Sequence, residues 1–113
     1  MPDIYEMTLY HQPFVAISKG CKRVEMRLFD EKRQLLKVGD FIRFTDKETG
    51  EEILTEITEL RTFKDFCALY EHYDKQVIGY GEDEVADPSD MLLYYSKEAI
   101  EKWGAFAITI RLC

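Results

Sequence analysis

The densest group of chemically capable side chains in this sequence is formed by Lys22, Glu25 and Arg27. Glu25 and Arg27 are two residues apart, so they share one face if this segment is a β-strand. Lys22 has the opposite parity. After a turn at Gly20 we expect it at the mouth of the strand, from where its long side chain could fold back toward Glu25, although the sequence alone does not decide whether it does. A lysine and an arginine beside one carboxylate can hold an anion or position a water molecule.

Each residue of this group has a possible role. Lys22 would bring positive charge to a carbonyl or phosphate group, or act as a base if burial disfavoured its charged form. Glu25 would hold Lys22 or activate water, and Arg27 would clamp a carboxylate, a phosphate or a base edge. Lys32 and Arg33 would extend the group as a basic lip for a nucleic-acid backbone. The alternative is that Glu25 and Arg27 only pair across a solvated strand face, worth about 0.2–1 kcal/mol.

Other residues with possible chemistry are scattered. Tyr80 is a candidate for stacking on a nucleic-acid base. The two histidines, His11 and His72, have no neighbours at metal-ligand spacing, and the three cysteines form no CxxC pair. We therefore expect no metal site, no cofactor and no disulfide framework.

Charge is distributed unevenly along the chain. The net charge is −7, from 15 basic and 22 acidic residues. Residues 19–37 nevertheless carry seven basic and three acidic side chains. An acidic protein with one basic segment suits a small or local anionic ligand better than a long duplex. The longest apolar stretch, residues 105–110, is too short for a membrane span, and no leader pattern precedes the first strand, so we expect a cytoplasmic protein.

The elements that must position these side chains follow from periodicity and turn signals. With 113 residues, we expect one domain over residues 1–113. Alternation and composition predict strands over Ile4–Tyr10, Lys22–Leu28, Phe41–Thr45, Glu52–Leu60 and Ala105–Leu112. Helical spacing and caps predict helices over Pro13–Lys19, Phe63–Tyr73 (capped by Thr62), Pro88–Tyr95 and from Ser96 to Trp103, with a helical turn within Asp30–Leu36.

A five-strand sheet of this size must close or cover its edges. The sequence therefore predicts an α+β fold, a small β-barrel of about five strands with helices packed around it. Two packing details are specific: Phe14 and Ile17 share the buried face of the first helix, and Phe63, Phe66, Cys67 and Tyr70 form the buried stripe of the second.

Residues 20–27, GCKRVEMR, resemble the recurrent GxKxxExR element of the ASCH domain family, which is related to the PUA-like β-barrels. Residues 30–33 (DEKR) and 38–40 (VGD) follow in the order typical of that family. The likeness extends over most of the chain: it includes Pro13-Phe14 upstream and Gly79-Tyr80, Asp90-Met91 and Tyr94-Tyr95-Ser96 downstream. In these segments the chain is similar to small stand-alone bacterial members of the family.

The resemblance implies a PUA-like barrel whose ligand cleft lies beside the GxKxxExR motif, and a role close to RNA or nucleotides. The first hypothesis is a module that binds RNA or a small nucleoside-like ligand. The second is an amidohydrolase acting on N4-acetylcytidine or a related acylated nucleoside, because some relatives have that activity. A metal-independent ribonuclease is the third, because some relatives are reported to cleave RNA.

One position departs from the deacetylase relatives. They have a threonine, the proposed nucleophile, three residues after the lysine, whereas this chain has Glu25. A hydroxyl-dependent acyl-enzyme route does not carry over, and only water attack assisted by Glu25 stays open. The family's second catalytic glutamate is not located by the sequence. Glu82 and Glu84 are candidates by region.

Overall fold

The computed structural model describes all of residues 1–113. Five strands and five helices follow one another along the chain as β1 (Ile4–Leu9), α1 (His11–Ser18), β2 (Val24–Leu28), the 3-10 helix η1 (Arg33–Leu35), β3 (Phe41–Asp46), β4 (Glu52–Phe63), α2 (Phe66–His72), the 3-10 helix η2 (Pro88–Leu93), α3 (Lys97–Trp103) and β5 (Ala105–Leu112). The predicted α+β class is confirmed.

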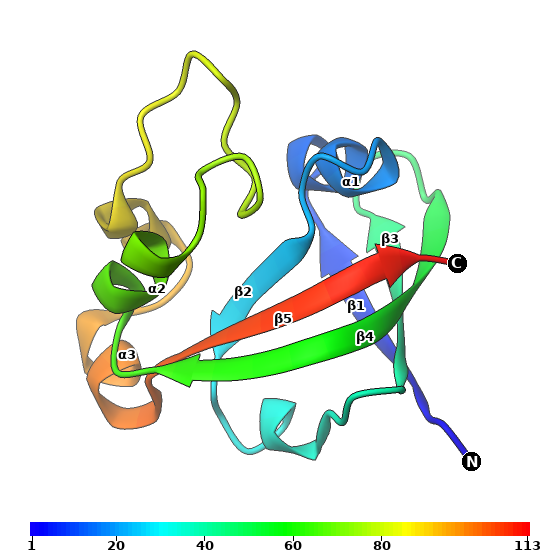
Figure 1. Cartoon of the computed structure of the whole chain (residues 1–113), viewed down its shortest axis with the longest axis horizontal. Helices are drawn as coiled ribbons and strands as arrows, with labels where there is room; N and C mark the ends of the chain where they lie inside the picture. Colours follow the sequence, from blue (N-terminus) through cyan, green and yellow to red (C-terminus); the bar gives the residue numbers. More distant parts are fainter.

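All five strands belong to one sheet, in the order β1-β3-β4-β5-β2. β1 pairs with β3 in parallel, and the other three pairs are antiparallel. The sheet curls into a half-barrel, with α1 above it and the α2 and α3 region beside it (Figure 1). β1 and β2 are therefore the two edge strands, and no backbone ladder joins them.

The inside of the half-barrel holds the first hydrophobic core. It is built by ten buried side chains, Leu9, Phe14, Ile17, Leu36, Ile42, Phe44, Ile57, Phe106, Ile108 and Ile110. Phe14 and Ile17 lie three residues apart on α1 and are both buried, as predicted. Because α1 contributes to this core, it holds the chain that leads out of β1 and into β2 close to the sheet.

A second core lies on the other side of β2 and β5. Its eight buried side chains are Val24, Leu28, Phe66, Leu69, Ile78, Met91, Ala105 and Ala107, and α3 packs against them through Ala99, Ile100 and Trp103. β2 and β5 are consequently covered on both faces. A charged side chain on β2 therefore has no route to bulk solvent across an open sheet face.

The prediction of a helix over Phe63–Tyr73 capped by Thr62 is wrong at its start. β4 continues through Phe63, which pairs with Ala105 of β5, so the ladder holds Thr62 and Phe63 in extended backbone. Asp65 is the residue that caps α2, and its carboxylate accepts a hydrogen bond from the Ala68 amide at 2.9 Å.

The later start also changes which residues of α2 are buried. Phe66 and Leu69 point into the second core, whereas Cys67 is exposed, contrary to the predicted stripe. The cap predicted for the last helix is confirmed, because the Ser96 hydroxyl accepts from the Ala99 amide at 3.1 Å. None of the helices combines the length and apolar character needed to cross a bilayer.

Candidate functional site

The strand register shows which way the charged residues of β2 face. Glu25 lies opposite Ile108 and Arg27 opposite Phe106 on the neighbouring strand β5. Ile108 and Phe106 belong to the core inside the half-barrel, and directly paired residues project from the same face of a sheet. Glu25 and Arg27 therefore face the interior, and the alternative of a solvated Glu–Arg strand pair is wrong.

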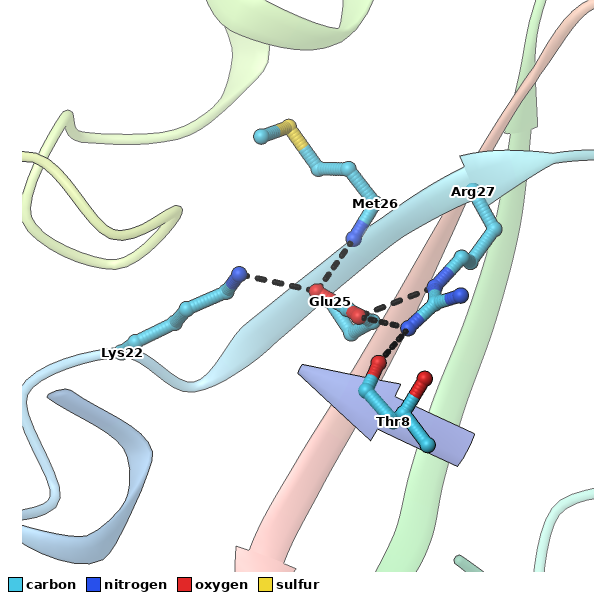
Figure 2. A network of polar contacts seen from close by, with 5 residues as sticks. All are labelled: Thr8, Lys22, Glu25, Met26 and Arg27. Carbon is cyan, nitrogen blue, oxygen red and sulfur yellow. Dashed lines mark hydrogen bonds and ion pairs between the residues drawn. The ribbon is translucent and has the colours of Figure 1, made fainter. Parts of the chain in front are cut away.

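Lys22, Glu25 and Arg27 converge on one carboxylate (Figure 2). Lys22 Nζ donates to Glu25 Oε1 at 2.8 Å. Arg27 donates to Glu25 Oε2 through Nε at 2.9 Å and through Nη2 at 2.7 Å. The Met26 amide also donates to Oε1, at 3.2 Å. Both oxygens of Glu25 are thus fully engaged, and the structure decides the open question of Lys22, whose side chain folds back toward Glu25.

This group is buried to an unusual degree for charged residues. Glu25 is 3% exposed and Lys22 is 7% exposed, while the Arg27 side chain is 16% exposed. Ionised groups are rarely this buried unless they are paired and hydrogen-bonded. Because two cations share one anion, the group keeps one formal positive charge that is not neutralised within it.

Lys22 reaches Glu25 from the loop that precedes β2, and the backbone at Gly79 leaves space for its side chain. The aliphatic stem of Lys22 passes over Gly79, where an added Cβ would lie 3.0 Å from Lys22 Cδ. Gly79 also has a φ of +110°, a conformation that other residues rarely adopt. A glycine at this position therefore allows Lys22 to lie flat against the chain.

Arg27 also connects the two edges of the sheet. Its Nη2 donates to the backbone oxygen of Thr8, on β1, at 3.2 Å (Figure 2). We call the gap between Thr8 on β1 and Arg27 on β2 the seam of the half-barrel. At this seam the two edge strands are connected by a side-chain contact and not by backbone pairing. The polar groups of Thr8 and Arg27 therefore lie at a sheet edge that no further strand extends.

The positive neighbours determine the protonation state of Glu25. Burial by itself raises the pKa of a carboxyl group, but the charges and hydrogen bonds of Lys22 and Arg27 outweigh it and lower the pKa of Glu25 to about 2. Glu25 is therefore ionised at neutral pH. A carboxylate with so low a pKa is a weak general base, which favours the role of holding Lys22 and Arg27 over that of activating water.

A cavity of about 610 Å³ opens at the seam, and all three residues line it. Its walls come from the end of β1, the start of α1, β2, α2, η2 and the loops between them. The charged lining residues are four bases, Lys22, Arg27, Arg33 and Lys47, and three acids, Glu25, Glu84 and Asp90. The cavity wall is thus net positive by one charge, although the chain as a whole carries −7.

Tyr80 lies in the cavity wall with its hydroxyl fixed. The hydroxyl shares a hydrogen bond with Tyr70 at 2.8 Å and donates to Asp90 Oδ2 at 2.7 Å. Burial and these two neighbours raise the pKa of Tyr80, so it stays a neutral donor. Its ring is therefore held in a fixed orientation between α2 and η2.

The other residues singled out from the sequence are placed differently. Arg33 lines the cavity and pairs with Asp30 at 2.9 Å. Lys32 is exposed and lies outside the cavity wall. Of the two carboxylates considered by region, Glu84 lines the cavity and Glu82 does not.

The structure adds a contact that the sequence did not indicate. His11 Nδ1 lies 2.7 Å from Asp46 Oδ2 and 3.5 Å from Glu48 Oε2, so His11 has two acidic neighbours although the sequence places none at metal-ligand spacing. These three groups could ligate a cation, but the other oxygen of Asp46 accepts from the Glu48 amide at 2.8 Å. Asp46 is thus satisfied without an ion. The separation of 35 residues explains why no spacing rule found this pair.

Comparison with solved structures shows the same architecture in other proteins. Hypothetical protein PH0355 is similar with a TM-score of 0.82 and 27% identity, over 97% of this chain and 99% of that one. Protein PF0455 from Pyrococcus furiosus has a TM-score of 0.75 and 27% identity, over 96% of each chain. The ZmASCH S128A mutant protein from Zymomonas mobilis has a TM-score of 0.69 and 18% identity, over 98% of this chain and 70% of that one. At this identity the similarity establishes a shared fold and nothing more.

A search of curated proteins found no match. The half-barrel with its surrounding helices is the PUA-like fold that the resemblance implied. The family model described as the ASCH domain matches residues 7–112. This range includes all of the helices and all of the strands, apart from the start of β1. This chain therefore belongs to the ASCH domain family.

Proposed function

We propose that this protein binds RNA or a small nucleotide-like ligand in the cavity at the seam, with Lys22 and Arg27 as its principal cationic contacts. The observation that carries this proposal is the buried group of two cations around Glu25 inside a cavity of about 610 Å³. The ASCH family is generally RNA-binding, which agrees with it.

The charge of the cavity supports an anionic ligand. Glu25 uses both oxygens on Lys22, Arg27 and the Met26 amide, so its negative charge is already compensated within the protein. The three donors of an ammonium and the five of a guanidinium exceed what one carboxylate accepts. The remaining donors of Lys22 and Arg27 are suited to a phosphate or a carbonyl oxygen.

The size and lining of the cavity support a ligand with a flat ring. Ligand sites are typically cavities of about 300–1,000 Å³ with mainly apolar walls and a few convergent polar groups. Here the cavity falls within that range and is lined by five tyrosines, Tyr10, Tyr70, Tyr80, Tyr94 and Tyr95. In the proposed complex, the ring of Tyr80 contacts a base while the cations hold its phosphate or carbonyl group.

Binding of ribonucleoside 5′-monophosphates and of short single-stranded RNA tests this proposal. We expect saturable binding that weakens with salt and is lost in Lys22→Ala. Lys19→Ala is the matched control, because it removes an equal charge from the same segment at an exposed position outside this cavity. Absence of saturable binding by wild-type protein at low salt would refute the proposal.

The basic lip has a distinct expected effect. Arg33 lines the cavity, so Arg33→Ala weakens binding of both mononucleotides and RNA. Lys32 lies outside the cavity wall, so Lys32→Ala weakens binding only of RNA long enough to reach it. Equal effects of Lys32→Ala on mononucleotides and RNA would contradict this assignment.

A second candidate function is hydrolysis of N4-acetylcytidine or a related acylated nucleoside. The observation that favours it is that a carboxylate, Glu84, lines the same cavity as Lys22. Lys22 would polarise the amide carbonyl, and Glu84 would activate water, since Glu25 is too weak a base. Turnover of N4-acetylcytidine is expected to fall in Lys22→Ala and in Glu84→Gln. Equal turnover in wild type and both variants would remove these residues from any such reaction.

A further inference from the structure

Two tyrosines at the cavity differ from the other five of the chain. Tyr10 and Tyr94 are 56% and 54% exposed, whereas the remaining tyrosines are half-buried. Tyr10 precedes α1 and Tyr94 follows η2, so they are distant in sequence. Their ring centroids nevertheless lie 6.1 Å apart, and both residues line the cavity. Large aromatic surface left exposed beside a cavity is typical of a binding surface.

A cation completes this surface. Lys47 Nζ lies 4.5 Å from the centre of the Tyr10 ring, and Lys47 also lines the cavity. The Lys47 amide donates to the Leu9 carbonyl at 2.9 Å, which fixes the backbone beside the end of β1. We call Tyr10, Tyr94 and Lys47 the aromatic rim. Lys47 lies over the ring of Tyr10, whereas no side-chain cation lies over the exposed ring of Tyr94, which is therefore open to a ligand.

No carboxylate pairs with Lys47, and its charge is used only in the contact with the Tyr10 ring. A flat aromatic ring with an unpaired cation beside it is complementary to a base and its phosphate. The rim differs from the group around Glu25 in this respect, because the cations of that group are buried and paired with a carboxylate.

We propose that the aromatic rim is a second nucleotide subsite, in which the base next to the nucleotide in the cavity stacks on Tyr94 while Lys47 contacts the linking phosphate. This inference rests on the proposed function, because it takes the cavity as the first subsite. It specifies the ligand further: single-stranded RNA with at least two nucleotides. A base inside a duplex presents no free face to Tyr94, so duplex RNA does not use the rim.

Dissociation constants of ribonucleoside 5′-monophosphates and of the corresponding 5′-phosphorylated dinucleotides provide the test. In wild-type protein the dinucleotide binds about 5- to 150-fold more tightly, the range that one stacked base supplies. Tyr94→Ala abolishes this gain, which is measured as the ratio of the two dissociation constants. Tyr94→Phe retains the gain, because stacking needs the ring and not the hydroxyl. Lys47→Gln reduces the gain and makes dinucleotide binding less dependent on salt.

Leu35→Ala is the matched control, since Leu35 is 61% exposed and lies outside the cavity wall. It leaves both dissociation constants unchanged. Two outcomes overturn the second subsite and leave the proposed function standing. In the first, wild-type protein binds mononucleotides and gains no affinity from the second nucleotide. In the second, the gain in affinity persists in Tyr94→Ala. A wild-type protein that binds neither ligand overturns both.

Discussion

Replacing Glu25 by Gln tests how the buried group at the seam is held together. The substitution keeps the shape of the side chain but removes the charge shared by Lys22 and Arg27. Neutralising one member of a buried pair leaves the other charges uncompensated and typically costs about 3–5 kcal/mol. We therefore expect Glu25→Gln to be strongly destabilised at neutral pH.

The pKa of Glu25 gives an independent magnitude. Its pKa is lowered from an ordinary 4.5 to about 2, and each pKa unit corresponds to about 1.4 kcal/mol, so the ionised carboxylate contributes about 3 kcal/mol. Because the folded-state pKa is the lower one, this contribution is complete above about pH 4.5. It is lost as the pH falls toward about 2. A loss of this size is a large part of the stability of a domain this small.

Urea denaturation of wild type and Glu25→Gln from pH 7 to pH 3 measures this contribution. The difference in unfolding free energy is expected to be about 3 kcal/mol at pH 7 and to shrink as the pH decreases below 4.5. Glu56→Gln is the matched control, because Glu56 pairs with Arg111 at 2.7 Å on the surface, where such a pair is worth about 0–1 kcal/mol. Equal losses in the two variants at pH 7, or a difference independent of pH, would refute the reasoning.

Two further predictions concern contacts around the site. Gly79→Ala is expected to weaken nucleotide binding, because the new Cβ would lie 3.0 Å from Lys22 Cδ. Gly50→Ala is the matched control: Gly50 is also at positive φ, but a Cβ there would have no atom within 4 Å. It is expected to cost similar backbone strain, about 1–2 kcal/mol, and to leave binding unchanged. Equal binding by both glycine variants would contradict the steric role. The hydrogen bond that the His11 ring donates to the Asp46 carboxylate raises the pKa of His11. This contact therefore stabilises the fold below about pH 6.5 and is lost as the pH rises through the raised value. Asp46→Asn is expected to lower the His11 titration midpoint measured by NMR, and an unchanged midpoint would argue against the contact.

Many features of the strands and helices could be predicted from the sequence, because they depend on interactions between residues close together in the chain. Alternation along residues 22–28 placed Glu25 and Arg27 on the same strand face. Spacing of three placed Phe14 and Ile17 on the same helix face, and a serine before a helical stretch identified the cap of α3. Each of these features depends on residues within one turn or one pleat of each other, so the chain itself contains the information.

Contacts between distant segments decided the rest. Only the long β4–β5 ladder keeps Phe63 extended and delays α2 to Phe66, because backbone pairing across the sheet outweighs the helical spacing of those residues. Periodicity could not show that the charged face of β2 is the interior one. That face points into the core to which β1 and α1 contribute, and the position of these elements follows from the curling of the whole sheet.

The cavity and its rim belong to the same class of features. Lys47, Tyr94 and Lys22 come from three separate stretches of the chain and meet only because the half-barrel leaves its two edge strands unpaired. The sequence by itself therefore determined the strands, most of the helices and which charged residues share a face. The tertiary structure alone decided which of them are buried together, because burial depends on neighbours that no local pattern specifies.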